Sequence, residues 1–260
     1  MFISVGRSAT KIMILFYDVM TMLLSVFRNC IAVLGQGRAA VRTVLLKQVY
    51  FTGLEAVGII VTIAVIIGTV IVVQVVSLVG SNGSLTGKIL VWMMLRELAP
   101  LLTALIIISR SGTAIAAELG TMKINGELDT LEMMGIPVDR YLILPRIIGV
   151  TTSSLILTVY FVLTAFLGGF LVASLGWHIP FDQFFQGILA SLGLREIAAL
   201  FAKSALFGLL ISTVCCRYGL KVGRSATEVP QAATRAVMTS LFVVFMLDGL
   251  VTFVVSLTAI

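Results

Sequence analysis

Charged residues are scarce in this chain of 260 residues, which holds 12% charged and 59% hydrophobic side chains. A typical soluble domain has about 25% charged and about 45–50% apolar residues. The mean hydropathy of +1.14 agrees with this imbalance. The composition therefore excludes an ordinary soluble domain. It predicts one integral membrane domain over residues 1–260, with an N-terminal region at 1–50 and a transmembrane bundle at 54–260.

Histidine and cysteine are also scarce, which excludes several kinds of chemistry. His178 is the sole histidine, and Cys30, Cys215 and Cys216 lack the CxxC spacing of a zinc site. With one histidine, in an outer loop beside Trp177, no Ser-His-acid set can be assembled. We therefore predict no catalytic residue and no metal ligand. Cys215 and Cys216 are interpreted as packing residues, with a thiol role as the alternative.

A phosphate-binding loop of the form GxxxxGK[ST] is missing as well. The nearest candidate, at 83–89, has the wrong spacing and no hydroxyl after Lys88. A flexible turn between two spans explains this segment. Any ATP that drives this protein must then be hydrolysed by another chain, and we predict no cofactor bound by this one.

Long apolar runs are what the sequence does contain. About 20 apolar residues cross a hydrocarbon core about 30 Å thick. The sequence therefore predicts an all-α integral membrane fold with five transmembrane helices. A bend is expected at Pro100 in the second, because proline removes a backbone donor. The five predicted spans are 56–79, 89–117, 147–175, 197–216 and 236–260.

The N-terminal run at 12–27 is shorter and is followed by several basic residues. Its about 16 residues would reach only about 24 Å at 1.5 Å per residue. An amphipathic helix lying in the membrane interface fits better than a span, and no signal-peptide cleavage site follows. Entry of this segment into the bilayer is the alternative.

Lysine and arginine are unevenly distributed among the loops, and this predicts the orientation. Basic residues are enriched in cytoplasmic loops. With the N-terminus inside, only Lys88 and Arg195 among the loop cations lie clearly outside. We therefore expect a cytoplasmic N-terminus and a C-terminus on the far side. The net charge of +6 then reflects topology and needs no nucleic-acid partner to explain it.

Ionisable residues inside the apolar runs predict a polar cluster in the outer half of the membrane. Such residues are costly in lipid and usually face a bundle interior, a cavity or one another. The predicted members are Arg96, Glu97, Lys203 and Asp248, with Gln74 as a further candidate for a cavity. The cluster either fixes helix register as a structural ion-pair set, or lines a substrate cavity and relays partner motion.

The charged segment at 118–146 interrupts the lipid-like sequence and predicts a short cytoplasmic helix at about 126–134. Asn125-Gly126 is a turn signal, and Gly135 with a following proline is a stop signal. Leu128, Leu131 and Met134 would share a narrow apolar face of this helix. So short a helix is unstable alone in water, and we predict that it packs into a partner. A helix resting on lipid is the alternative.

Motifs in a fixed order then identify a resemblance to the MlaE permease family. They cover about 55–248, whereas the N-terminal 50 residues match only in general character. One departure is KVGR at 221–224, which is more basic than the family pattern. It leaves open an extra contact to a partner or to a lipid headgroup. The matching motifs are RELAP at 96–100, SRSGTA at 109–114, AELGTMK at 117–123, LEMMGIP at 131–137, PR at 145–146, AATRAV at 232–237 and LD at 247–248.

The resemblance implies the membrane subunit of an ATP-binding-cassette (ABC) transporter that moves phospholipid between two membranes. It implies a permease homodimer, a separate cytoplasmic ATPase that holds ATP and Mg²⁺, and an outer MCE-domain partner, with room for a small regulatory subunit on the ATPase. It places the chain in the inner membrane of a diderm bacterium, or less readily in a plastid envelope. Residues of the coupling helix and its ATPase docking surface would be Glu118, Gly120, Met122, Lys123, Glu127, Leu128, Leu131, Glu132 and Met134.

Two other classes of function compete with this interpretation. A secondary transporter would use the predicted intramembrane charges as a proton or ion relay and would need no partner, but the five spans show no repeated halves. A non-transporting scaffold of an envelope complex would bind partners without turnover. Neither alternative is an enzyme.

Overall fold

The computed structural model describes residues 21, 38–80, 82–223 and 225–257, and within them it is helical without strands. The predicted interfacial helix at 12–27 lies outside the described residues, except for Thr21. The α-helices are α2 Arg38–Thr52, α3 Val57–Val79, α4 Gly83–Met93, α5 Ala99–Ile107, α6 Thr113–Ile124, α7 Glu127–Met133, α8 Leu144–Trp177, α9 Phe181–Ser191, α10 Leu194–Leu220 and α11 Glu228–Leu257. Short segments join several of them: a 3₁₀-helix η1 Leu54–Ala56 and π-helices η2 Met94–Leu98, η3 Ile108–Gly112 and η4 Asp139–Ile143.

Five helical stretches are long and apolar enough to cross a membrane, which confirms the number and order of the predicted spans. The protein is therefore a multi-pass membrane protein. Each stretch begins before its predicted apolar run, because polar ends continue the helix outside the hydrocarbon core. The stretches are Arg42–Val79, Gly83–Ile124, Asp139–Trp177, Leu194–Leu220 and Glu228–Val254.

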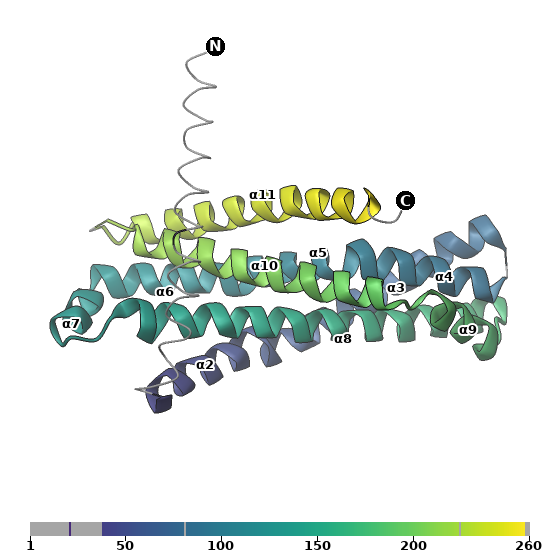
Figure 1. The fold of residues 1–260 in the computed structure, drawn as a ribbon, viewed down its shortest axis with the longest axis horizontal. Coiled ribbons are helices and arrows are strands. Elements are labelled where there is room, and N and C mark those ends of the chain that lie inside the picture. The colour runs from purple at the N-terminus through teal and green to yellow at the C-terminus, as the bar shows by residue number, and fades with distance from the viewer. Residues whose placement is uncertain (1–20, 22–37, 81, 224, 258–260) are drawn as a thin grey trace, which may run out of the picture.

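The long helices run along one axis of the molecule and define two ends (Figure 1). Helix α7 caps one end, which the charge distribution predicts to be cytoplasmic. Helices α4 and α9 pack together at the other end, predicted to face outward. Helix α2 lies obliquely against α8 near the α7 end. The two ends therefore present different elements to partners.

Close backbone approach holds the centre of the bundle together. A Cβ added at Gly68 of α3 would overlap the backbone of Ala165 in α8, and one added at Gly112 would lie 3.0 Å from the Cys215 sulfur. Small residues let membrane helices approach closely where lipid gives no hydrophobic driving force. Cys215 and Cys216 are both buried free thiols, which confirms their interpretation as packing residues.

Helix α11 is the least buried of the five spans. In the most apolar part of α11, 11% is buried inside the protein, compared with 56% for the corresponding part of the stretch from α4 to α6. Large apolar side chains, including Phe242, Phe245 and Phe253, are more than half exposed along it. In a membrane this face contacts lipid or another protein helix.

The second span is interrupted by two π-helical segments rather than by a simple bend at Pro100. Pro100 lies in the first turn of α5, directly after η2. Its missing N–H leaves the carbonyl of Arg96, four residues earlier, without the usual α-helical donor. The π-segments of this span also carry its charges, since Arg96 and Glu97 lie in η2 and Arg110 in η3. Single π-turns inside helices occur frequently at functional sites.

Candidate functional site

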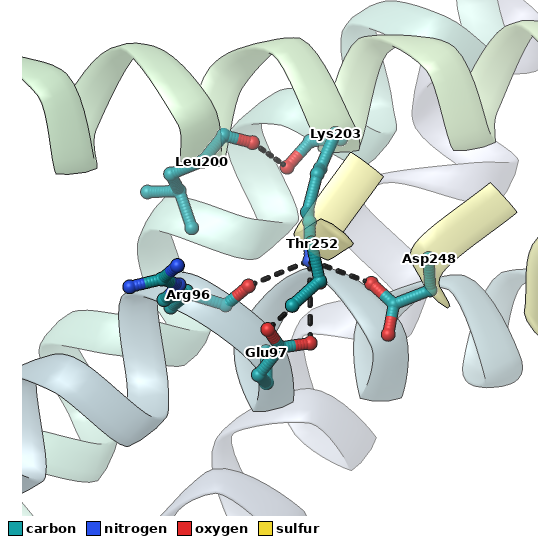
Figure 2. A network of polar contacts seen from close by, with 7 residues as sticks. Arg96, Glu97, Leu200, Lys203, Asp248 and Thr252 are labelled. Atoms are coloured by element: carbon teal, nitrogen blue, oxygen red, sulfur yellow. Dashed lines mark hydrogen bonds and ion pairs between the residues drawn. The ribbon is translucent and has the colours of Figure 1, made fainter. Parts of the chain in front are cut away.

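The predicted intramembrane cluster forms around the ammonium group of Lys203 (Figure 2). Lys203 is 1% exposed, and its Nζ donates to the Arg96 carbonyl oxygen at 2.8 Å and to Asp248 Oδ1 at 2.8 Å. The same Nζ lies 3.3 Å from Glu97 Oε2 and 2.8 Å from Thr252 Oγ1. Thr252 in turn donates to Glu97 Oε1 at 2.8 Å. The buried charge is therefore compensated by two carboxylates and two neutral oxygens.

Local backbone chemistry explains why these groups meet. Pro100 has no N–H to donate to the Arg96 carbonyl four residues earlier, and that carbonyl accepts from Lys203 Nζ. Asp248 and Thr252 are four residues apart on α11, so they lie on one face of that helix. The cluster consequently ties together three elements that are distant in sequence: η2, α10 and α11.

The structure places the predicted cluster residues unequally. Glu97, Lys203 and Asp248 meet through their side chains, whereas Arg96 contributes its backbone carbonyl. The Arg96 guanidinium points away from Lys203 and lies 5.7 Å from the ring centroid of Trp92 (Figure 2). Gln74 is exposed on α3 and is not part of this cluster.

Sequence reasoning missed Thr252, although a signal for it existed. It lies one helical turn after Asp248, so it shares that residue's inward face. A threonine is common in membrane helices and carries no charge, which made it inconspicuous beside the ionisable residues.

A second ion pair joins the start of the first span to the second π-segment and was also missed. Arg110 in η3 pairs with Glu55 in η1, and its Nη1 donates to the Phe51 carbonyl at 3.1 Å. The guanidinium also lies 5.1 Å from the Phe51 ring centroid. Arg110 was a visible charge inside an apolar run, but its partner Glu55 lies just outside the predicted first span.

A helix is present at the centre of the charged segment, where the sequence predicted one. Gly126 has φ 74° and reverses the chain before α7, and the Asn125 amide donates to Glu127 Oε1 at 3.1 Å. Gly135, also at φ 74°, ends the helix as predicted. Positive φ strains residues that carry a Cβ, so glycine suits both positions. The role of α7 in coupling stays a prediction.

The predicted apolar face of this helix is divided in the structure. Leu128 is buried in the core of the bundle, and Leu131 is half-buried against it. Met134, directly after the helix end at Met133, is 69% exposed. Met133 is itself 82% exposed. The exposed apolar surface of α7 therefore consists of two methionines at its C-terminal end.

The remaining residues predicted for the coupling segment also divide into two sets. Glu118 pairs with Arg146 at 2.9 Å, and Lys123 donates to the Leu220 carbonyl, so both contact their own chain. Glu127 and Glu132 are exposed and form no ion pair among the described residues.

Two apolar positions of the coupling segment pack against the bundle. Gly120 is buried, and a Cβ added there would lie 2.9 Å from Val222 Cγ2. Met122 is half-buried against the core. These two residues pack inside the chain and offer little surface to a partner.

A cavity of about 620 Å³ lies beside the exposed part of α7, at the loop that returns to the bundle. Its lining combines acids, a base and apolar groups, a mixture typical of a protein-binding surface rather than a metal site. Among the described residues, no three His, Cys, Asp or Glu side chains gather as metal ligands would. The lining residues are Glu132, Gly135, Ile136, Pro137, Asp139 and Arg140.

Comparisons with known proteins cover both regions. The family model described as Permease MlaE matches residues 45–254. A probable ABC transporter permease of Synechocystis is 35% identical over 81% of this chain and 80% of its own length. The intermembrane phospholipid transport system permease protein MlaE of Haemophilus influenzae is 30% identical over 80% of this chain and 81% of its own. The chloroplast protein TRIGALACTOSYLDIACYLGLYCEROL 1 of Arabidopsis thaliana is 30% identical over 78% of this chain and 59% of its own. The chain belongs to the MlaE permease family.

Proposed function

We propose that this protein is the membrane subunit of an ABC transporter that moves phospholipid out of or across the inner membrane of a diderm bacterium. The observation that carries the proposal is the family match over residues 45–254, which includes the ion cluster and α7. The similar Haemophilus influenzae protein is named as a permease of intermembrane phospholipid transport. The chain itself is a non-catalytic subunit in this proposal.

ATP hydrolysis belongs to a separate cytoplasmic ATPase, which holds ATP and Mg²⁺. Helix α7 docks on it through its exposed residues: the acids Glu127 and Glu132 and the methionines Met133 and Met134. Flexible, polarizable methionine adapts well to a groove on a partner, and exposed acids steer association toward a basic surface. The adjacent cavity offers further contact surface.

The remaining partners follow from the orientation of the bundle. With α7 in the cytoplasm, the N-terminus is also cytoplasmic and the α4–α9 end faces the periplasm, where an MCE-domain protein receives or delivers lipid. A second copy of the chain covers part of the exposed apolar surface, and α11 is the least buried span available for it. The lipid cavity lies at the centre of this dimer.

In the proposed cycle, ATP-driven closure of the ATPase displaces α7 and thereby the spans on either side of it, α6 and α8. The Lys203 cluster keeps η2, α10 and α11 in register while the bundle tilts, because breaking it would leave charges unpaired in lipid. Glu97 has the most exposed side chain of the cluster's three charged groups, at 35%, and is the group through which the cluster meets the surrounding space.

Gentle detergent extraction followed by reconstitution into lipid vesicles tests this function. We expect a copurified ATPase and nucleotide-dependent movement of labelled phospholipid. Flux driven by an ion gradient without a partner would support the secondary-transporter alternative instead. Stable partners without any turnover would support the scaffold alternative.

A further inference from the structure

Three charged residues around the loop that carries α7 form polar contacts with their own chain, and two of them also remain exposed to solvent. They are Glu118 and Lys123 on α6 and Arg146 on α8. Unlike Glu127 and Glu132, which form no ion pair among the described residues, these three already have partners within the chain. Their contacts join the segment before α7 to two other spans.

The first contact links the helix before α7 to the helix after it. Arg146 Nη2 lies 2.9 Å from Glu118 Oε1, and the arginine side chain is 4% exposed. Its Nη1 has no hydrogen-bond partner among the described groups, so Glu118 is the acceptor that compensates this buried cation. An uncompensated buried charge is strongly destabilising, which makes separation of α6 from α8 costly.

The second contact links the same helix to the cytoplasmic end of α10. Lys123 Nζ donates to the Leu220 carbonyl, one of the last carbonyls of α10, which have no intrahelical partner. A positive charge at a helix C-terminus is also favourable for the helix dipole. Immediately beside it, a Cβ added at Gly219 would lie 2.8 Å from the Ala116 carbonyl oxygen, so the two helices touch through their backbones.

Helix α10 is thereby attached to the second span at two levels. At the predicted cytoplasmic end it is held by Lys123, and toward the other end Lys203 binds Glu97 and the Arg96 carbonyl. A helix fixed at two points moves as a unit with the element that holds it. Displacement of α6 is consequently passed to α10 and, through Asp248, to α11.

We propose that Glu118, Lys123 and Arg146 are positioning residues that transmit the displacement of α7 to α8 and α10, and that they do not form the docking surface of the ATPase. This inference rests on the proposed function. It divides the coupling segment into an inner brace, made of these three residues, and an outer docking surface at Glu127, Glu132 and the two methionines.

The test uses the complete chain purified with its ATPase and reconstituted into phospholipid vesicles. Glu118→Gln keeps the size and an acceptor oxygen but removes the charge, and Lys123→Met removes the donor from an exposed position. Lys47→Met, at an exposed position on α2, is the matched control for the second change. Three quantities are measured: ATPase retained on the permease, ATP hydrolysed, and labelled lipid moved per ATP.

For the two brace variants we expect unchanged ATPase retention and a loss of lipid moved per ATP of about threefold or more, since residues along a coupling path change coupling by such amounts. The ratio is normalised to assembled complex, so a loss of folded protein alone would not change it. Lys47→Met should resemble the wild type in all three quantities. Glu132→Arg should instead lower ATPase retention.

A double substitution shows whether Glu118 acts through Arg146. If it does, Glu118→Gln combined with Arg146→Gln loses no more coupling than the larger single loss, because residues of one network are not additive. If Arg146→Gln does not assemble, Glu118→Gln and Lys123→Met decide the question.

Loss of ATPase retention in either brace variant would overturn the inference, because it would make these residues part of the docking surface. An unchanged lipid-to-ATP ratio in both variants would also overturn it. Failure of the wild type to retain an ATPase or to move lipid would instead contradict the proposed function.

Discussion

The Lys203 cluster and the exposed surface of α7 both carry acidic residues, but the acids are paired in the cluster and unpaired on α7. Inside the bundle, Glu97 and Asp248 are bonded to Lys203 or Thr252. On α7, Glu127 and Glu132 are exposed and form no ion pair within the described chain. Water stabilises a free carboxylate and lipid does not. An acid inside the bundle therefore needs a partner, whereas an acid on the exposed surface of α7 does not. Acids left unpaired in water are free to meet a partner.

Removing the central cation should break this contrast most severely. Lys203→Ala leaves Glu97 and Asp248 without their counter-charge inside the bundle, and we expect a loss of about 3–5 kcal/mol in the free energy of unfolding. Denaturant titration of the purified protein measures it. Lys88→Ala, an exposed lysine outside the cluster, serves as the control and should leave the transition midpoint unchanged. Equal stability of the two variants would show that the cluster carries no net stabilisation.

The lipid transport of the same variant separates the two roles of the cluster. If Lys203→Ala assembles normally and moves lipid at the wild-type rate, the cluster has no role in transport. Its contribution would then be limited to helix register. A loss of transport in assembled complex would assign it a part in the cycle.

A matched pair of acids sharpens the comparison at a smaller scale. Glu97→Gln should lower the free energy of unfolding by about 1.5–3 kcal/mol, the usual worth of a hydrogen bond to a charged group. Glu132→Gln should not change the stability, since surface substitutions away from contacts are nearly neutral. Thermal unfolding monitored by circular dichroism distinguishes them. A larger loss at Glu132 would show that α7 is held by its acids.

Thr252→Val tests the neutral member of the cluster. Valine keeps the shape but removes the hydroxyl that bridges Lys203 and Glu97, and we expect a loss of about 1 kcal/mol. Thr234→Val on the same helix is the control, because the Thr234 hydroxyl bonds only the carbonyl of Pro230 one turn earlier. Comparable losses in the two variants would argue against a network.

The smallest effect on stability is expected at the exposed end of α7. Met133→Ser with Met134→Ser removes apolar groups that already contact solvent, so the unfolding transition should not shift measurably. If these methionines fill a groove of the ATPase, less ATPase should copurify at high salt, where the contribution of the acids is screened. Full retention at every salt concentration would remove the methionines from the docking surface.

Much of the cluster could be predicted because a charge inside an apolar run is a rare signal. Glu97, Lys203 and Asp248 each stood out for this reason, and the cost of isolating them in lipid predicted that they meet. Gln74 lies exposed on α3 outside the cluster, and its assignment to a lipid cavity stays a prediction. The backbone role of Arg96 was beyond this signal, because a side-chain pattern does not reveal which carbonyls lack donors.

Predictions were weakest for the short helices. No helix was predicted at α9, whose 11 residues are too few to form a span. Its fold depends on close contact with α4, where a Cβ at Gly87 would lie 3.1 Å from the Ile188 nitrogen. A periodic signal was nevertheless present and was missed, since Phe181, Phe184, Phe185 and Ile188 recur at the i, i+3, i+4, i+7 spacing of an amphipathic helix. The predicted end of α7 was wrong by one residue, because a helix terminus is set by local turn geometry.

The position of Pro100 has a consequence for how a membrane helix can be made to recognise a cation. Pro100 removes the backbone N–H that would bond the Arg96 carbonyl in an α-helix, and this leaves the oxygen more open to Lys203 Nζ. A proline four residues downstream thus favours this carbonyl as a hydrogen-bond acceptor without contributing an atom to the contact. The ring of Pro100 therefore influences where the Lys203 ammonium binds, although no hydrogen bond joins these two residues.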